Sequence, residues 1–400
     1  MLRIEDRISN PKHKAIYRLI RNHPTVSKLE LLEQTKMPVS TLTRLLEELI
    51  QQRFIVEAGF GDSTGGRKPV LYRIHSDYAY VFGLEISRTR SKLVLYDMDL
   101  KKLASEQWRM DEHSTPDYLL QSIAQSAHYM LADRQIAKED VLGLGIGSVG
   151  PLDRSTGTLL KPQHFPAPGW VNVPVADILS RSLDIPVFLD NGANTAILGE
   201  YWHVRDKRYK HLLYVHVGAG IRSAMIAGGS VVYGAVDTEN AIGQMIIQSD
   251  GHRLTPDSNF GSLESYVSIP AIEREARSKL KQGRQSVVTM MEPDPEKIGF
   301  IHLQQALTAN DPLVTEIFKQ ASAYLGIGLA NLLNILHPEK VILGGPILYS
   351  HPLVFETAVE VANRNTYHHS DYRAEFSRGN LGEEALVLGA AVMTIHKLAD

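Results

Sequence analysis

The order of strands and helices constrains this chain most, because it changes near residue 77. From Tyr78 on, apolar strands alternate with longer helical runs, as in "YAYVFGLEIS", "SKLVLYDMD" and then "DYLLQSIAQSAHYMLADR". A second set of strands follows, and the last buried strand is "KVILGGP". Strands that alternate with helices are typical of an α/β sheet core. The body of the chain is therefore predicted to form two α/β lobes with a cleft between them.

The composition agrees with a globular chain of several domains. The chain has 400 residues, of which 44% are hydrophobic, and at roughly 100–200 residues per domain it should hold two or three domains. It contains no run of about 18 uncharged apolar residues, and its start is too polar for a signal peptide, so we expect a cytoplasmic protein without a membrane partner. The absence of cysteine excludes disulfides and thiolate zinc ligands.

The charge of the chain is unevenly distributed. Residues 1–75 hold 13 Lys and Arg against 8 Asp and Glu, a net charge of +5, whereas the remainder holds 29 against 37, a net charge of −8. A basic segment joined to an acidic body is typical of a module that binds a polyanion, attached to a domain with another task. Chance clustering of charge on a solvated face is the alternative.

The first 52 residues have the pattern of three short helices. The run "HKAIYRLIRN" places its apolar residues on one helical face, and residues 22–24 end it. A second helix is expected to begin after Ser27, which has Glu30 three residues later in the arrangement of a capping box. After the turn "KMPV", the run "STLTRLLEELIQQ" predicts a third helix capped by Ser40. This order predicts a helix-turn-helix.

The third helix has the residue types of a recognition helix. Its apolar face is formed by Leu42, Leu45, Leu46 and Leu49. Short hydroxyls and one Arg remain on its first turns, and a recognition helix enters the major groove by this end, where such groups reach phosphates and base edges. The residues of this helix that we expect to contact DNA are Ser40, Thr41, Thr43 and Arg44.

The segment "FIVEAGFGDSTGGRKPVLYRI" predicts two strands around a glycine-rich tip, which completes a winged helix. Gly65 and Gly66 permit a sharp bend, and Arg67 and Lys68 are expected to enter the minor groove or to hold phosphate. The alternative is a three-helix module that binds protein. Charge, turn, recognition helix and basic wing together favour DNA.

Six segments of the body carry a family resemblance. They are "GLGIGSVGPLD", "PVFLDNGANTAILGEYW", "LLYVHVGAGI", "AIGQM", "LGIGLANLLNILHPEKVILGG" and "LGEEALVLGAAV". In order and spacing across residues 80–395 they resemble the ROK family of repressors, open reading frames and kinases, and the first part of the chain resembles the DNA-binding part of its NagC/Mlc-type repressor branch. The resemblance implies an actin-like, ribonuclease-H-like ATPase fold with a sugar site in the cleft, often assembled into dimers or tetramers.

The domain boundaries follow from this resemblance. Residues 1–76 are expected to form the winged helix-turn-helix domain, and residues 77–195 the first α/β lobe, to which residues 381–400 return. Residues 196–380 are expected to form the second lobe, with the ligand cleft and the dimerisation surface.

The motifs that a ROK sugar kinase needs are altered. In the first phosphate loop, Ser87 and Arg88 stand where the kinases have glycines, which obstructs close approach of a nucleotide phosphate. The second loop, residues 218–222, ends in Arg222, which holds the phosphate of a sugar phosphate or faces solvent. The catalytic Asp of the kinases corresponds to Gly192, which cannot act as a base. Asp190 lies two residues away, where a strand end directs it elsewhere.

The zinc motif of the family is altered as well. In "NAIGQM", Gln244 replaces the expected His, and Leu254, Pro256 and Ser262 stand near the three expected cysteines. The remaining His252 makes no zinc site by itself. We therefore expect no metal, and a loop that packing and hydrogen bonds hold in place.

Polar residues remain in the expected cleft. Asn191, Gln244, Glu264 and His164, which lies near Trp170, are the predicted ligand-binding residues, because amides, a carboxylate and an aromatic face suit a hydroxyl-rich ligand. In the alternative interpretation Asn191 only caps the following helix and Glu264 only opens its own.

These features predict a transcriptional regulator, specifically a repressor, with no catalytic residue and no cofactor. Its expected partners are double-stranded operator DNA, a sugar or sugar phosphate, and further copies of the chain in a homodimer or homotetramer. Closure of the cleft on the ligand would change the spacing of two recognition helices and release the operator. The alternatives are an active sugar kinase with an attached DNA-binding part, and a DNA-binding or scaffold protein that needs no ligand.

Overall fold

The computed structural model describes residues 8, 10–62, 68–162, 165–205, 209–235, 241–367 and 372–399. It divides into two compact units, of which the first comprises Met1–Arg208 with Glu384–Asp400 and the second Tyr209–Glu383. In the part of the chain that is described, no helix is long and apolar enough to cross a membrane.

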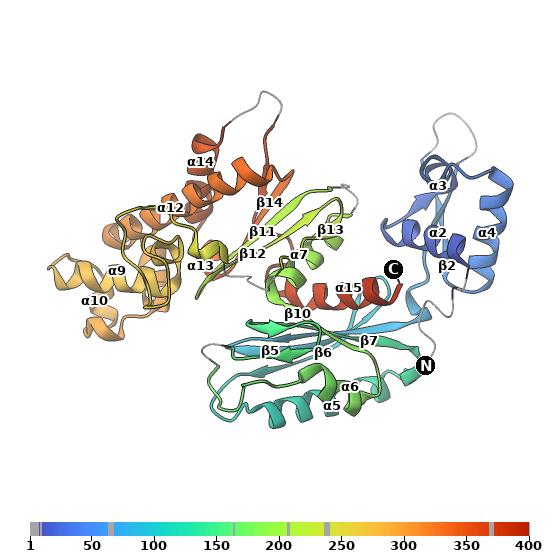
Figure 1. The fold of residues 1–400 in the computed structure, drawn as a ribbon, viewed down its shortest axis with the longest axis horizontal. Helices are drawn as coiled ribbons and strands as arrows, with labels where there is room; N and C mark the ends of the chain where they lie inside the picture. The colour runs from blue at the N-terminus through green and yellow to red at the C-terminus, as the bar shows by residue number, and fades with distance from the viewer. Residues whose placement is uncertain are drawn as a thin grey trace. The chain divides into compact units, whose positions relative to one another are not determined.

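The N-terminal part of the first unit has the predicted order of three helices and a two-stranded wing (Figure 1). Its short first strand pairs with the third in a sheet of order β1-β3-β2, with antiparallel neighbours. The four leucines predicted for the apolar face of the third helix are buried, as expected. Its elements are α2 (Pro11–Arg21), β1 (Val26–Ser27), α3 (Lys28–Thr35), α4 (Val39–Gln51), β2 (Ile55–Phe60) and β3 (Val70–Ile74).

The caps of two of these helices differ. The predicted capping box of α3 is present, with the Ser27 N–H donating to the Glu30 carboxylate at 2.8 Å and the Glu30 N–H donating to the Ser27 hydroxyl at 3.2 Å. The prediction that Ser40 caps α4 is wrong. Pro38 occupies the N-cap with φ −59° and ψ 141°, so the chain enters the helix at Val39 and the Ser40 hydroxyl comes too late to cap it.

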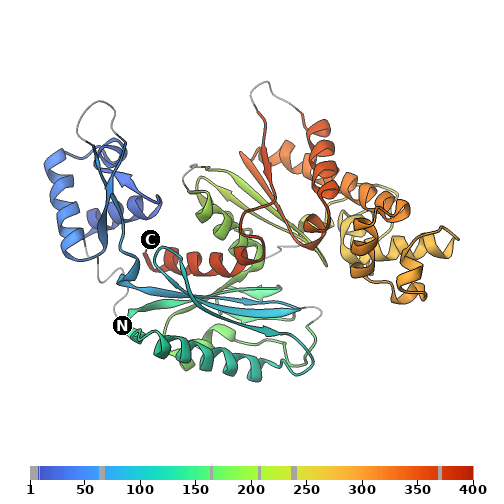
Figure 2. The ribbon, with the colours of Figure 1, turned by 180° about the vertical axis from the view of Figure 1, so that it is seen from behind.

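The first lobe is a five-stranded sheet of order β10-β7-β4-β5-β6. Strands β10, β7 and β4 are parallel to one another, and β5 runs antiparallel to both of its neighbours, β4 and β6. Helices α5 and α6 cover one face, and α15 and α7 lie on the other (Figures 1 and 2). The elements are η1 (Ser76–Tyr78), β4 (Tyr80–Ile86), β5 (Arg90–Asp97), β6 (Lys102–Arg109), α5 (Pro116–Asp133), η2 (Lys138–Asp140), β7 (Val141–Ser148), β8 (Leu152–Asp153), β9 (Thr158–Leu159), α6 (Val175–Leu183), β10 (Val187–Asn191), α7 (Gly192–His203) and α15 (Ala385–Ala399).

Glycines let α15 approach this sheet closely. A Cβ atom on Gly83 would lie 2.1 Å from the Val387 carbonyl oxygen, and one on Gly145 would lie 1.9 Å from that of Ala390. Because such distances are far inside van der Waals contact, any side chain at either position would push the helix away. The C-terminal segment thus returns to the first unit, while α7 runs through the predicted lobe boundary at residue 195 and belongs to the same unit.

The second unit is built on a sheet of order β13-β12-β11-β14-β15, in which β11, β14 and β15 are parallel. Alternate residues of β11 and β14 face a core that α9, α11 and α12 complete. Its elements are β11 (Leu212–Val217), β12 (Ile221–Ala227), β13 (Ser230–Val231), η4 (Ala241–Gln244), α8 (Glu264–Val267), α9 (Ile269–Lys281), α10 (Val288–Met291), η5 (Pro295–Lys297), α11 (Phe300–Thr308), α12 (Pro312–Leu336), β14 (Lys340–Gly344), α13 (Pro346–Ser350), α14 (Pro352–Asn365), β15 (Glu375–Ser377) and η6 (Gly382–Glu384).

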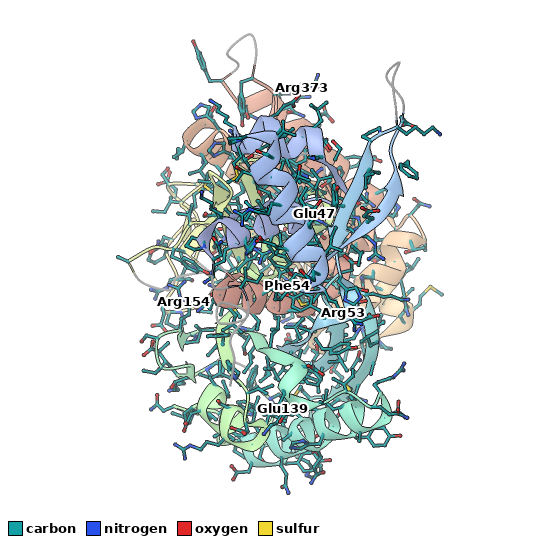
Figure 3. The ribbon with its side chains drawn as sticks, turned by 90° about the vertical axis from the view of Figure 1, so that its right-hand side faces the viewer. Glu47, Arg53, Phe54, Glu139, Arg154 and Arg373 are labelled. Carbon is teal, nitrogen blue, oxygen red and sulfur yellow. The ribbon has the colours of Figure 1, made fainter. Side chains whose placement is uncertain are left out.

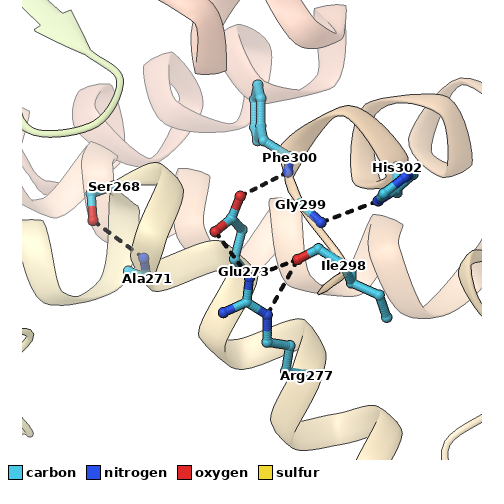
Figure 4. Close-up of polar contacts among 8 residues, drawn as sticks. All are labelled: Ser268, Ala271, Glu273, Arg277, Ile298, Gly299, Phe300 and His302. Carbon is cyan, nitrogen blue, oxygen red and sulfur yellow. Dashed lines mark hydrogen bonds and ion pairs between the residues drawn. The ribbon is translucent and has the colours of Figure 1, made fainter. Parts of the chain in front are cut away.

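Side chains of α9 hold the start of α11 in this unit (Figure 4). The Glu273 carboxylate accepts the Phe300 N–H at 2.8 Å, which satisfies one of the backbone donors that the first turn of a helix leaves open. Arg277 donates to the Ile298 carbonyl at 2.7 Å and lies 3.4 Å from Glu273. The two helices are therefore joined by polar contacts as well as by the core.

Candidate DNA-binding surface and ligand site

The first turns of α4 expose the polar residues predicted to contact DNA, and the structure shows how each is held. Ser40 and Arg44 are exposed, whereas Thr41 and Thr43 are half-buried. The Thr43 hydroxyl donates to the Val39 carbonyl at 2.7 Å and accepts a hydrogen bond from the Lys28 ammonium of α3. The ammonium group of Lys28 thus lies beside the start of the recognition helix, a position that the sequence pattern did not reveal.

Arg44 lies in a small charged cluster. Its guanidinium donates to the Glu48 carboxylate at 2.9 Å, and the other Glu48 oxygen lies 2.7 Å from Nε2 of His13 on α2. The Arg44 side chain is 65% exposed, so this pair is screened by water and easily exchanged for another anion. Glu47, on the same helix, is also exposed and is labelled in the view onto the winged helix (Figure 3). The structure thus leaves Arg44 exposed in a surface ion pair, and its contact with DNA stays a prediction.

The wing is described in part. Lys68, at the start of the returning strand, is exposed. Arg67, Gly65 and Gly66, which were predicted to form the tip, lie outside the described residues. The contact of Arg67 and Lys68 with DNA therefore remains a prediction from sequence.

An aromatic cluster joins α2 to the end of the winged helix. The hydroxyls of Tyr17 and Tyr78 are 2.7 Å apart, and both rings meet Phe54 edge to face. Burial raises the pKa of Tyr17 to about 12, and the hydrogen bond to Tyr78 opposes that rise. Arg73 on β3 lies 3.1 Å from Asp99. These contacts connect the winged helix to η1 and to the turn that follows β5.

The strand end that opens α7 is a buried polar network. Asn191 is the N-cap of α7, and its side-chain oxygen accepts the Asn194 N–H at 2.8 Å. The Asp190 carboxylate accepts the Asn191 N–H at 2.7 Å and the Asn194 side-chain amide at 3.0 Å. Asn191 is only 3% exposed and Asp190 only 1%. Asn191 therefore caps α7, and its contact with a ligand stays a prediction.

The position of the kinase base is closely packed. A Cβ atom on Gly192 would lie 2.9 Å from a side-chain methyl of Leu386. At the first phosphate loop, Arg90 reaches back to Glu85 through Nε at 3.3 Å and through its terminal nitrogen at 3.2 Å. Glu85 is 6% exposed, so the pair is mostly shielded from water. A guanidinium of the protein thus neutralises the carboxylate of this loop.

In the second unit, Glu264 and Gln244 both have partners in the protein. The Glu264 carboxylate accepts the Ile221 N–H at 3.0 Å, which ties α8 to the second glycine-rich loop. The Gln244 side-chain oxygen accepts the Asn259 N–H at 2.8 Å, and its carbonyl accepts the Asn259 side-chain amide at 3.0 Å. Both residues therefore organise loops, and neither contact was visible from the sequence. The fourth predicted ligand-binding residue, His164, lies outside the described residues.

The loop that carries the altered zinc motif is held by hydrogen bonds, as predicted. The Ser265 carbonyl accepts a guanidinium N–H of Arg274 at 3.0 Å and lies 3.1 Å from Nε2 of His252. The Ser258 hydroxyl accepts the N–H groups of Leu254 and Thr255 at 3.1 and 2.9 Å. Over the described ranges, no group of three or more His, Cys, Asp or Glu side chains could hold a metal.

Comparison with known proteins follows the same division into N-terminal part and body. The profile of the ROK family matches residues 81–397. The chain belongs to the ROK family. Among its ROK relatives, the xylose repressor of Caldicellulosiruptor bescii is 26% identical over 96% of this chain and 95% of its own length. The transcriptional dual regulator NagC of Escherichia coli is 24% identical over 86% of this chain and 82% of its own.

ROK proteins of known structure show which part of the chain is common to the family. A ROK transcriptional regulator described as a homologue of the E. coli MLC protein superposes with a TM-score of 0.77 at 20% identity, over 98% of this chain and 97% of that one. The ROK hexokinase of Thermus thermophilus superposes with a TM-score of 0.66 at 25% identity, over 80% of this chain and 98% of that one. The actin-like α/β fold is therefore shown for the body, and the regulator matches the chain over nearly its whole length.

Proposed function

We propose that this ROK protein is a sequence-specific DNA-binding regulator, a repressor, whose body senses a sugar or sugar phosphate. The observation that carries the proposal is the winged helix, with a recognition helix that exposes Ser40 and Arg44, joined to a kinase-like body. Two relatives that match 96% of this chain are named as xylose repressors, whereas the ROK hexokinase of Thermus thermophilus matches 80% of it.

The surface chemistry of the winged helix supports DNA as the partner. Residues 1–75 carry a net charge of +5, which favours binding to a phosphate backbone. The residues proposed to contact DNA are Ser40, Thr41, Thr43 and Arg44 on α4 together with Arg67 and Lys68 of the wing. Arg44 is assigned to a base edge, because a guanidinium matches the two acceptors of guanine. Arg67 and Lys68 are assigned to phosphate or the minor groove. A regulator of this kind acts on DNA in the cytoplasm.

The body is proposed to bind a ligand without turning it over. Gly192 offers no carboxylate to take the proton of an attacking hydroxyl, and the ion pair of Glu85 with Arg90 occupies the loop that would approach nucleotide phosphates. Asn191, Gln244, Glu264 and His164 are the residues proposed to contact the sugar. Binding without catalysis turns such a site into a sensor, and no cofactor or metal is required.

Signalling to DNA is proposed to use two or more copies of the chain. In a homodimer or homotetramer, two recognition helices meet successive major grooves, and their spacing decides affinity. A ligand that binds one arrangement of the lobes better than the other shifts the population of the two. The sugar-bound arrangement is the one that fits the operator less well, so the sugar acts as inducer.

Selection of binding sites tests the DNA-binding part of this proposal. The full-length protein is incubated with a random duplex library, and the bound duplexes are sequenced over several rounds. A recurring motif with two related half-sites is expected, and affinity should fall with rising salt because phosphate contacts release counterions. Enrichment of no motif would contradict the proposal. Sugar-dependent release of ADP from ATP at ordinary enzymatic rates would instead favour an active kinase.

A further inference from the structure

Val39 is an apolar residue on the surface that the proposed function assigns to DNA. It is the first residue of α4, and it is 59% exposed. Residues four apart lie one above the other on a helix, as Val39 does with Thr43 and Ser40 with Arg44. These two adjacent pairs form one stripe of the helix surface. The buried face of α4 is formed by its leucines, so the hydrophobic core does not require Val39.

The geometry of Thr43 extends this apolar surface. A hydroxyl has one proton to donate, and that of Thr43 goes to the Val39 carbonyl at 2.7 Å, while its oxygen accepts from Lys28. The hydroxyl therefore has no proton left to donate to a base, and the Thr43 methyl is the apolar part of the side chain that can add to the Val39 surface. Val39 lies one turn before it on the same stripe. The start of the recognition helix thus presents methyl groups next to the ammonium of Lys28.

We propose that Val39, together with the Thr43 methyl, contacts the C5-methyl group of a thymine in the operator. Thymine is the base whose major-groove edge carries a methyl group, and apolar side chains recognise it by contact. The contact would specify one A·T pair in each half-site, next to the base that Arg44 reads. This inference rests on the proposed DNA-binding function and adds a specificity determinant to it.

Removal of a single methyl group from the DNA tests the contact. Each thymine of the duplex obtained by site selection is replaced in turn by deoxyuridine, which lacks only the C5-methyl, and binding of the full-length protein is measured by fluorescence anisotropy. At one thymine per half-site the wild type should lose about fourfold in affinity, the effect of exposing roughly one methyl group. Val39→Ala should bind the thymine duplex about fourfold more weakly. It should show a clearly smaller further loss with deoxyuridine at that site, because only the Thr43 methyl remains to contact the thymine.

A matched variant separates this contact from general effects. Leu29 on α3 is 63% exposed in the same N-terminal part, and Leu29→Ala should keep the full loss on methyl removal. Val39 is mostly exposed, so Val39→Ala should fold normally, which circular dichroism checks. The inference is overturned if no thymine methyl affects the wild type, or if Val39→Ala keeps the same loss. If the protein selects no DNA sequence at all, the proposed function fails first.

Discussion

Arg90 lies 3.2 Å from Glu85, and this ion pair stands at the loop where ROK kinases bring glycines to the nucleotide phosphates. The pair is mostly shielded from water, since only 20% of the Arg90 side chain and 8% of the Glu85 side chain are exposed. The Arg90 guanidinium therefore compensates the charge of the buried Glu85 carboxylate within the protein. The pair and Gly192 lead to a prediction about catalysis.

Restoring the missing carboxylate should not restore kinase activity. Gly192→Asp supplies a base at the kinase position, yet Ser87, Arg88 and the Glu85–Arg90 pair still obstruct the phosphate loop, and the new Cβ meets Leu386. Release of ADP in the presence of ATP, magnesium and a panel of hexoses should equal that of the wild type. A sugar-dependent rate in Gly192→Asp well above the wild type would show that the loop still accepts ATP.

Asn191 should prove to have a structural role that can be separated from ligand binding. Asn191→Ala removes the N-cap of α7 and leaves the buried Asn194 N–H without its acceptor, so the free energy of unfolding should fall by about 1–3 kcal/mol in denaturant titrations. Asn191→Ser keeps a capping oxygen and should lose less. If Asn191 also touches the sugar, Asn191→Ser should fold well but lose the rise in Tm that an added sugar produces in the wild type. Equal stability of the alanine variant and the wild type would contradict the capping role.

The loop of residues 245–266 should depend on Arg274 and be insensitive to chelators. Arg274→Ala removes the donor to the Ser265 carbonyl and should lower the free energy of unfolding by about 1–3 kcal/mol. Arg274→Lys keeps the charge with a different geometry, so its free energy of unfolding should lie between those of the wild type and Arg274→Ala. EDTA should leave the wild-type Tm unchanged, because hydrogen bonds replace the zinc ligands. A fall in the wild-type Tm with EDTA would reveal a metal in this protein.

Stability should decline in alkaline solution, and Tyr17 should contribute to the decline. Burial raises the pKa of Tyr17 from 10.0 to about 12, so the folded protein favours the neutral phenol. A group with a raised pKa contributes stability below its unfolded pKa and loses it as pH rises through the folded one, here between about 10 and 12. In Tyr17→Phe the fall of Tm over this range should be shallower than in the wild type. If Tm falls with pH equally steeply in Tyr17→Phe and in the wild type, Tyr17 does not contribute to the decline.

The sequence predicted the elements whose signals are local. The capping box of Ser27 with Glu30 and the buried leucines of α4 depend on residues within one or two turns, and they were predicted correctly. Strand β6 was missed because it is an edge strand with mostly exposed residues, so it lacks the apolar alternation that marks a strand. The cap of α4 was misplaced because Pro38 fixes the backbone two residues earlier than the Ser40 signal suggests.

The candidate sites show the same limit more clearly. Glu264 reaches Ile221 across 43 residues, and Lys28 reaches Thr43 from another helix, so no sequence spacing indicates either contact. The pair of Arg44 with Glu48 does have a signal, because residues four apart meet on a helix surface. The residue at the kinase base position needs no coordinates: Gly192 stands where ROK kinases have an Asp, and that is visible in the sequence alone.

Release of operator DNA by a sugar tests the central claim most directly. The full-length protein is bound to its selected duplex, and fluorescence anisotropy is followed while xylose, N-acetylglucosamine, other sugars and their phosphates are added in turn. One of these compounds should release the duplex in a saturable manner, and Arg44→Ala should bind that duplex more weakly by about 1–3 kcal/mol, the value of one base contact. A sugar-sensing regulator would be contradicted if the protein binds its duplex tightly and specifically, and none of these compounds changes either that binding or the Tm of the protein.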